Sequence, residues 1–212
     1  MPVQVWHPPV EIPNLPAPDL KASTHRSRKD LERVLADHAD AAAWDDLVVT
    51  YDEMAAEWTE WAREQPWYAA AVSAGMAHAR PVRWLLEVGC GTGQATEVLS
   101  KVGPAVIATD VNVSMLRGAP ALPRVSYVAA DVRRLPLATG SAPMIVALNG
   151  VPDLAEFARV LPVGGQLLWC TSFGPGTPLY VPPDRLADLL GPQWATQAGR
   201  AGHGDWLLAT RM

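Results

Sequence analysis

The sequence predicts an α/β fold, doubly wound around seven mostly parallel strands and ending in an antiparallel hairpin. From residue 82 onward, apolar strand patterns alternate with helical patterns, which favours a parallel sheet covered by helices. The apolar run at 84–88 passes directly into the glycine-rich segment 89–93, an order typical of a buried strand followed by a loop that approaches a ligand. Near the C-terminus, the glycines between 199 and 204 predict the hairpin turn.

The N-terminal part divides from this core by its composition. Six prolines within residues 1–20 exclude a helix and predict an extended or disordered arm over 1–26, which Trp6 and His7 could anchor. Ser27 with Asp30 predicts a helix start, and Thr50 with Glu53 predicts a second one. We therefore expect a helical extension or lid at 27–80 and a core domain at 81–212.

The core elements follow from the same patterns. Strands are expected at 82–88, 105–110, 125–130, 143–149, 166–172, 192–198 and 205–211. Helices are expected near 93–102, 112–118, 153–160 and 183–190, after a helical stretch at 67–79.

Composition excludes several classes of function. With 49% apolar residues the chain can bury one large core, and its net charge of −5 without a Lys/Arg cluster argues against nucleic acid as a partner. No segment has the length and polarity of a signal or a membrane span, so we expect a soluble cytoplasmic protein without a membrane partner. Cys90 and Cys170 are expected as small core residues, and no His or Cys spacing indicates a metal site.

The glycine loop is the strongest functional signal. Gly89, Gly91 and Gly93 follow Glu87 with the spacing G-x-G-x-G, and Gln94 stands where the dinucleotide fingerprint needs glycine or alanine. A nicotinamide cofactor is therefore disfavoured. A loop of this kind leads into a helix whose free N–H groups favour a negatively charged group.

Three further segments follow at strand ends, where ligands of open α/β sheets bind. The second strand ends at Asp110, 23 residues after Glu87, where a carboxylate can accept two hydrogen bonds from ribose hydroxyls. The third strand ends at Asp131 and the fourth at Asn149, and residues 156–165 read Glu-Phe-Ala-Arg-Val-Leu-Pro-Val-Gly-Gly.

Together these segments resemble the class I S-adenosylmethionine-dependent methyltransferases, which have a Rossmann-like fold. The resemblance implies S-adenosylmethionine as cofactor and S-adenosylhomocysteine as product, with Met115 against the adenine ring, and Asp131 and Val132 holding its edge. It further implies that the Asn149 carbonyl faces the cofactor's amino group. The full implied cofactor set is Tyr51, Glu87, Gly89, Cys90, Gly91, Gly93, Asp110, Val111, Met115, Asp131, Val132 and Asn149.

The acceptor side is less defined. Trp58, Trp61, Asn149 and Phe173 are expected to contact a flat apolar acceptor, with the tryptophans on a lid as an alternative to plain core packing. His203, in the final hairpin, is the candidate general base, with a polar turn residue as the alternative. For His7, His25 and His78, the surrounding sequence indicates only a surface or packing role.

These observations lead to a hypothesis with two rivals. We expect a methyltransferase acting on a small, apolar or aromatic molecule at O, N or C, as a monomer or homodimer. One alternative is another catalyst on the same fold, a cyclase, isomerase or aminopropyl transferase. The other is a non-catalytic, cofactor-binding partner subunit.

Overall fold

The computed structural model describes residues 2–15, 25–63, 65, 67–103 and 105–212; the side chains of residues 58, 59 and 61–63 are outside this description. These residues form one sheet of eight strands in the order β1-β7-β8-β6-β5-β2-β3-β4. All neighbouring pairs are parallel except β6–β8 and β7–β8. The strands are β1 (Val5–Trp6), β2 (Trp84–Val88), β3 (Ala105–Asp110), β4 (Val125–Ala129), β5 (Met144–Leu148), β6 (Gln166–Cys170), β7 (Trp194–Ala201) and β8 (Gly204–Arg211). The predicted fold class is confirmed.

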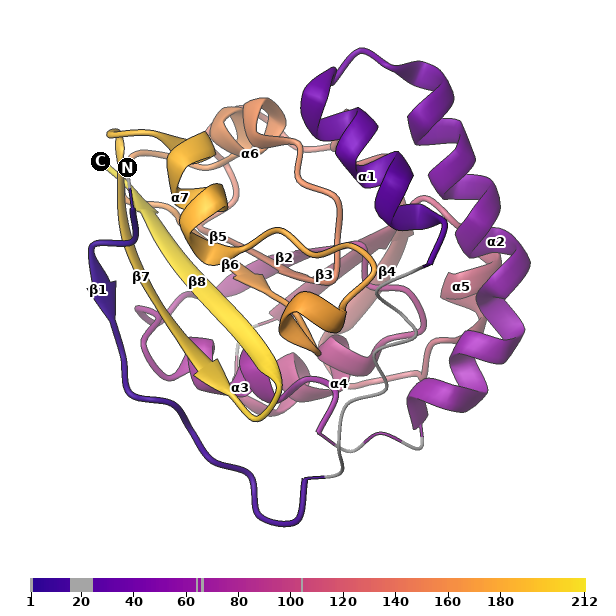
Figure 1. The fold of residues 1–212 in the computed structure, drawn as a ribbon, viewed down its shortest axis with the longest axis horizontal. Coiled ribbons are helices and arrows are strands. Elements are labelled where there is room, and N and C mark those ends of the chain that lie inside the picture. The colour runs from indigo at the N-terminus through magenta and orange to yellow at the C-terminus, as the bar shows by residue number, and fades with distance from the viewer. Residues whose placement is uncertain (1, 16–24, 64, 66, 104) are drawn as a thin grey trace.

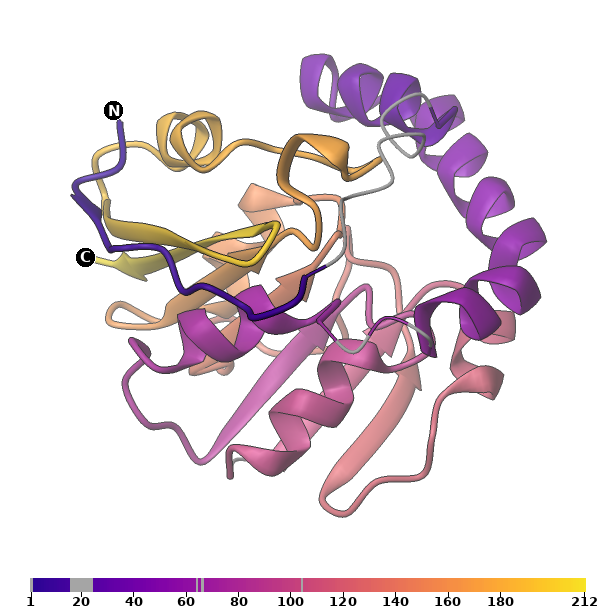
Figure 2. The ribbon, with the colours of Figure 1, turned by 60° about the horizontal axis from the view of Figure 1, so that its bottom comes forward.

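Helices cover both faces of the sheet (Figure 1). They are α1 (Ser27–Ala36), α2 (Ala41–Arg63), α3 (Ala70–Met76), α4 (Gln94–Lys101), α5 (Val113–Gly118), α6 (Leu154–Val160) and α7 (Pro183–Leu190). α3 and α4 lie on one face and α6 and α7 on the other, while α1 and α2 form a helical pair at the side of the molecule near α5 (Figure 2).

Strand alternation divides the core into two layers. Leu167 and Trp169 of β6 pack into the cluster that contains Phe157 of α6, whereas Leu168 and Cys170 pack into the cluster that contains Val72 of α3. Residues that alternate along a strand point to opposite faces, so a continuous apolar run is what a sheet covered on both faces requires. Cys90 and Cys170 are buried and unbridged, as expected.

The N-terminal arm joins the sheet as an eighth strand, which adds to the seven expected. β1 pairs in parallel with β7 through Val5 and Gln197, and the His7 and Val10 amides donate to carbonyls of Ala198 and Arg200, each at 2.8 Å. The His7 ring stacks on Trp206, while half of Trp6 is exposed. His7 therefore anchors the arm to its own domain.

Two element boundaries differ from expectation. α2 begins at Ala41, nine residues before the predicted start at Thr50, because the Asp40 carboxylate accepts from the Ala43 amide at 2.9 Å and begins the helix there. β7 runs through Gly199 to Ala201, so the turn of the hairpin is at Gly202 and His203 alone.

The helical stretch at 67–79 is also shorter than expected, since α3 covers only 70–76 and packs against β6, β7 and β8. The division at 26/27 and 80/81 stays a prediction, with α3 in contact with the sheet. None of the described helices is long and apolar enough to cross a membrane.

Candidate active site

A cavity of about 560 Å³ opens at the carboxyl ends of β2, β3 and β5, within the range of small-molecule sites. Its floor is formed by the glycine loop and the acids at the strand ends, and its walls come from α2, the loop after β4 and the loop before α7. Most of the cofactor-binding residues predicted from the sequence line it: Tyr51, Glu87, Gly89, Cys90, Gly91, Asp110, Val111, Met115, Asp131, Val132 and Asn149. Gly93 is outside the lining.

The glycine loop has the conformation that its sequence demands. Gly89 and Gly91 have φ values of 66° and 54°, a left-handed region that residues with a Cβ rarely adopt. The Gly91 amide donates to Asp110 at 2.8 Å, so the end of β3 holds the loop that follows β2. Gly93 serves the turn instead, with φ 92° at the start of α4.

A buried carboxylate, Glu87, and a partly buried one, Asp110, make the floor of the cavity acidic. Glu87 is 1% exposed and accepts the Thr96 hydroxyl at 2.7 Å, and burial raises its pKa to about 8. Burial also raises the pKa of Asp110, although the amides of Asn112 and Gly91 favour its charged form. Each ionised carboxylate disfavours the other, so a cationic ligand here would relieve both. A sulfonium or ammonium group meets that requirement.

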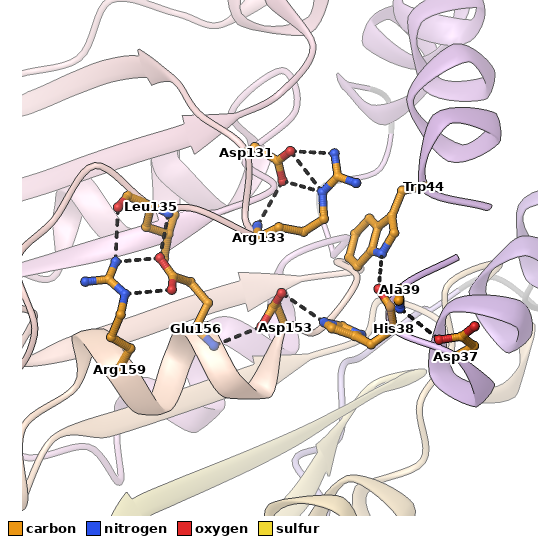
Figure 3. Close-up of polar contacts among 10 residues, drawn as sticks. All are labelled: Asp37, His38, Ala39, Trp44, Asp131, Arg133, Leu135, Asp153, Glu156 and Arg159. Carbon is orange, nitrogen blue, oxygen red and sulfur yellow. Dashed lines mark hydrogen bonds and ion pairs between the residues drawn. The ribbon is translucent and has the colours of Figure 1, made fainter. Parts of the chain in front are cut away.

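Asp131 lies at the cavity with its charge already compensated. Arg133 pairs with it at 2.6 Å through Nη2, and the Arg133 amide donates to Asp131 Oδ1 at 2.9 Å, so the pKa of Asp131 is lowered, although its partial burial raises it. The guanidinium carbon lies 5.2 Å from the centre of the Trp44 ring, a cation–π geometry (Figure 3). The contact between Asp131 and the adenine edge of the cofactor remains a prediction. An adenine bound there would share the Asp131 carboxylate with Arg133.

The side chain of Asn149 lines the cavity and is hydrogen-bonded within the protein, and its acceptor role stays a prediction. Its amide nitrogen donates to the hydroxyls of Tyr68 and Ser172, and its Oδ1 accepts from the Ser172 amide at 2.8 Å. With φ at 56°, the residue adopts a conformation that asparagine tolerates better than most residues. Asn149 therefore positions Tyr68, which also lines the cavity.

The predicted acceptor residues separate into three groups. Phe173 lines the cavity, as expected, and is 7% exposed. Trp58 and Trp61 belong to α2, but their side chains are outside the described part of the structure. His203 does not line the cavity: its ring meets Trp67 edge-on at 5.7 Å, and Trp67 in turn packs against Phe173. The structure therefore does not bring the candidate base to the site.

Sequence reasoning missed several residues of the cavity wall. Trp44, Leu47 and Val48 lie in the first turns of α2, ahead of the start predicted at Thr50. The signal was present, because 44, 47, 51 and 54 repeat at helical spacing and Asp40 is a good N-cap residue. His25 also lines the cavity, and the packing role given to it from the sequence was incomplete.

The turn between α1 and α2 is fastened to the core beside the cavity (Figure 3). His38 Nε2 lies 2.9 Å from Asp153 Oδ2, and Asp153 also caps α6 by accepting from the Glu156 amide at 2.8 Å. Trp44 donates from Nε1 to the His38 carbonyl at 3.2 Å. His38 lies beyond the end of α1 and makes this polar contact from the turn.

We expect His38→Ala to lower the free energy of unfolding by about 0.5–1 kcal/mol, because one hydrogen bond to a buried carboxylate is lost while the imidazole is partly exposed. Urea unfolding of the ligand-free protein measures the change. Glu32→Gln is the matched control, since Glu32 pairs with Arg185 on the surface. Equal effects of the two substitutions would contradict the fastening role of His38.

No group of three or more His, Cys, Asp or Glu residues in the described part of the chain is arranged to hold a metal ion.

Comparison with known proteins agrees with this geometry. Residues 85–165 match the family described as "Methyltransferase domain". The demethylmenaquinone methyltransferase of Thermobifida fusca is 31% identical over 147 residues, which cover 63% of this chain and 61% of that protein. The chain thus spans about three fifths of the length of this curated relative.

Solved structures share the fold at low identity. A putative S-adenosyl-L-methionine-dependent methyltransferase from Methanococcus maripaludis superposes with a TM-score of 0.61 at 17% identity, covering 76% of this chain and 93% of that one. The complex of DhpI with SAH gives a TM-score of 0.61 at 18% identity, with 77% and 94% covered. At these identities the likeness establishes the fold.

Proposed function

Because this chain belongs to the class I S-adenosylmethionine-dependent methyltransferases, we propose that it transfers a methyl group to a small apolar or aromatic molecule. The observation that carries the proposal is one continuous cavity with two kinds of wall. Its acidic floor and glycine loop suit a cationic nucleoside cofactor, and its apolar side suits a flat acceptor.

The residues present fit the cofactor. The left-handed glycines at 89 and 91 keep the loop free of Cβ atoms, Asp110 holds that loop, and Met115 is a buried apolar surface in the cavity. Bound S-adenosylmethionine would supply a methyl group already activated on a sulfonium. The chain then has to bind, orient and desolvate the reactants, and orientation alone can contribute ~7–11 kcal/mol.

The proposed class of acceptor follows from the apolar part of the cavity wall, away from the glycine loop and the acids. Leu47, Met54, Phe173 and Leu179 contribute apolar surface, and Trp44 adds a ring. Pockets of this composition select by shape and a few placed polar groups. The T. fusca relative is named for demethylmenaquinone, so a compound of that class belongs in the first acceptor panel.

Two measurements test the proposal. Calorimetric titration should show binding of S-adenosylmethionine and S-adenosylhomocysteine, with the protein stabilised by ~2.7 kcal/mol at a hundredfold excess over Kd. Transfer of labelled methyl should then appear with aromatic acceptors and be absent with sugars. A folded protein that binds neither cofactor form would contradict the proposal, and binding without transfer across the panel would favour a cofactor-binding partner subunit.

A further inference from the structure

A chain of three side chains leads from the cavity wall to a histidine. Tyr51 of α2 and His25, which precedes α1, both line the cavity, and their rings lie 6.5 Å apart. Between them Ser27, fully buried, has its Oγ 2.7 Å from His25 Nδ1 and 3.5 Å from the Tyr51 hydroxyl. These contacts connect the site to one imidazole nitrogen.

Hydrogen bonding sets the direction of this chain. The Ser27 amide donates to His25 Nδ1 at 3.3 Å, so that nitrogen carries a lone pair and its proton is on Nε2. The Ser27 hydroxyl therefore also donates to Nδ1, and its oxygen accepts from the Tyr51 hydroxyl. Each group can pass a proton toward His25. The 3.5 Å step is long, as hydrogen bonds in ligand-free active sites often are before the reactants draw them together.

We propose that His25 is the general base of the proposed methyl transfer and receives the acceptor's proton through Tyr51 and Ser27. The inference rests on the function proposed above and specifies its substrate class: an acceptor with an X–H bond, such as a phenolic hydroxyl, placed against Tyr51. It assigns a role to a residue for which the sequence indicated only a surface or packing role.

The step balances in atoms and charge. The acceptor's lone pair forms the new X–C bond while the bond from the methyl carbon to sulfur breaks and its electron pair stays on sulfur. The acceptor's proton goes to the Tyr51 oxygen, the Tyr51 proton to Ser27, and the Ser27 proton to His25 Nδ1. The positive charge that leaves sulfur is then on the imidazolium, which returns its proton to water.

The surroundings of these groups suit the roles. Burial, with help from Arg26, lowers the pKa of His25, so the imidazole is neutral at pH 7 and Nδ1 is free of a proton to accept one. Burial raises the pKa of Tyr51 to about 12, so its hydroxyl keeps a proton to pass on. Arg26, next to His25, is ion-paired with Glu53 of α2. The charge of Asp110 acts on Tyr51, and apolar Pro178 and Leu179 line the same cavity from the loop before α7.

The test compares two flat acceptors of equal size, 2-naphthol and quinoline. Naphthol must lose a proton when its oxygen is methylated, whereas the quinoline nitrogen has none to lose. We expect His25→Gln to lower kcat for 2-naphthol by about 10²- to 10⁴-fold, the usual contribution of a general base, and to leave the calorimetric Kd of S-adenosylhomocysteine unchanged. The acid limb of the wild-type pH–rate profile should disappear in this variant.

Ser27→Ala and Tyr51→Phe provide the same test with small losses of volume, if His25→Gln does not fold. His78→Gln is the matched control, because His78 also has a pKa lowered by burial but stacks on Trp206 away from the cavity. Wild-type rates and an unchanged acid limb in His25→Gln would overturn the relay. In the wild-type protein, methyl transfer to quinoline without transfer to 2-naphthol would also overturn the relay, although the methyltransferase function would stand.

A measurement without turnover separates the relay from the proposed function. Nitrogen-15 NMR of the histidines, in the complex with S-adenosylhomocysteine, should show His25 with its proton on Nε2 above its pKa. A proton on Nδ1 would overturn the relay, because that nitrogen could then not receive one. If neither acceptor is methylated, the acceptor class proposed above fails, and this spectrum still decides the relay.

Discussion

Asp110→Ala is expected to weaken cofactor binding by about 10²- to 10⁴-fold. A hydrogen bond to a charged group contributes ~1.5–3 kcal/mol, the substitution would remove the two bonds that we predict to the ribose hydroxyls, and 1.4 kcal/mol corresponds to a tenfold change in Kd. The same carboxylate also accepts from the amides of Gly91 and Asn112, so the glycine loop loses its support. Calorimetric titration with S-adenosylhomocysteine measures the loss.

Asp110→Asn separates these two contributions, because its carbonyl oxygen can still accept one of the backbone bonds. We expect it to bind more tightly than Asp110→Ala and more weakly than the wild type. Glu97→Ala is the control for charge, since Glu97 is an exposed carboxylate in the first turn of the neighbouring α4. Wild-type affinity in Asp110→Ala would remove the central support for the cofactor site.

Glu87→Gln is expected to stabilise the ligand-free protein above pH 5 by an amount that grows up to about pH 8. In the folded state burial raises the pKa of Glu87 to about 8, against an ordinary value of 4.5. Between these values the unfolded chain releases the proton and the folded chain retains it, so the stability of the wild type falls as pH rises. The glutamine does not titrate, and the difference should reach a few kcal/mol.

Urea unfolding of both proteins at several pH values measures this difference. Subtracting the two curves removes the contribution of the other titrating groups, because these are common to both. Thermal unfolding in saturating S-adenosylmethionine should show a smaller difference, since a cation near Glu87 favours its charged form. A difference that is constant from pH 5 to 8 would show that Glu87 is ionised throughout and contradict the expectation.

The parts of the site that could be read from the sequence are those built by local order. Glu87, the glycine loop, Asp110 and Asp131 each stand at the end of an apolar run. In a parallel sheet the carboxyl ends of the strands meet at one edge, so sequence order alone brings these residues together. The strong cofactor signal and the correct fold class both follow from this rule.

The parts that could not be read depend on pairings across long separations. β1 joins β7 although 192 residues separate Val5 from Gln197. The proline-rich sequence does not predict which strand of the sheet it will pair with. The side chain of Asn149 is hydrogen-bonded to Tyr68 and Ser172, contacts across 81 and 23 residues that the sequence does not show. His203 lies in the hairpin turn, as the sequence predicts, but its ring packs against Trp67 and does not line the cavity.

By itself, then, the sequence determined the α/β fold, the order of its core elements and the acids and glycines at the cofactor end of the cavity, because apolar periodicity and glycine act within a few residues. Tertiary structure alone decided the acceptor end: that Trp44 of α2 lies at the cavity wall, and that His25 meets Tyr51 through Ser27. Those choices depend on which helix packs over which strand end, and packing is decided by the whole molecule.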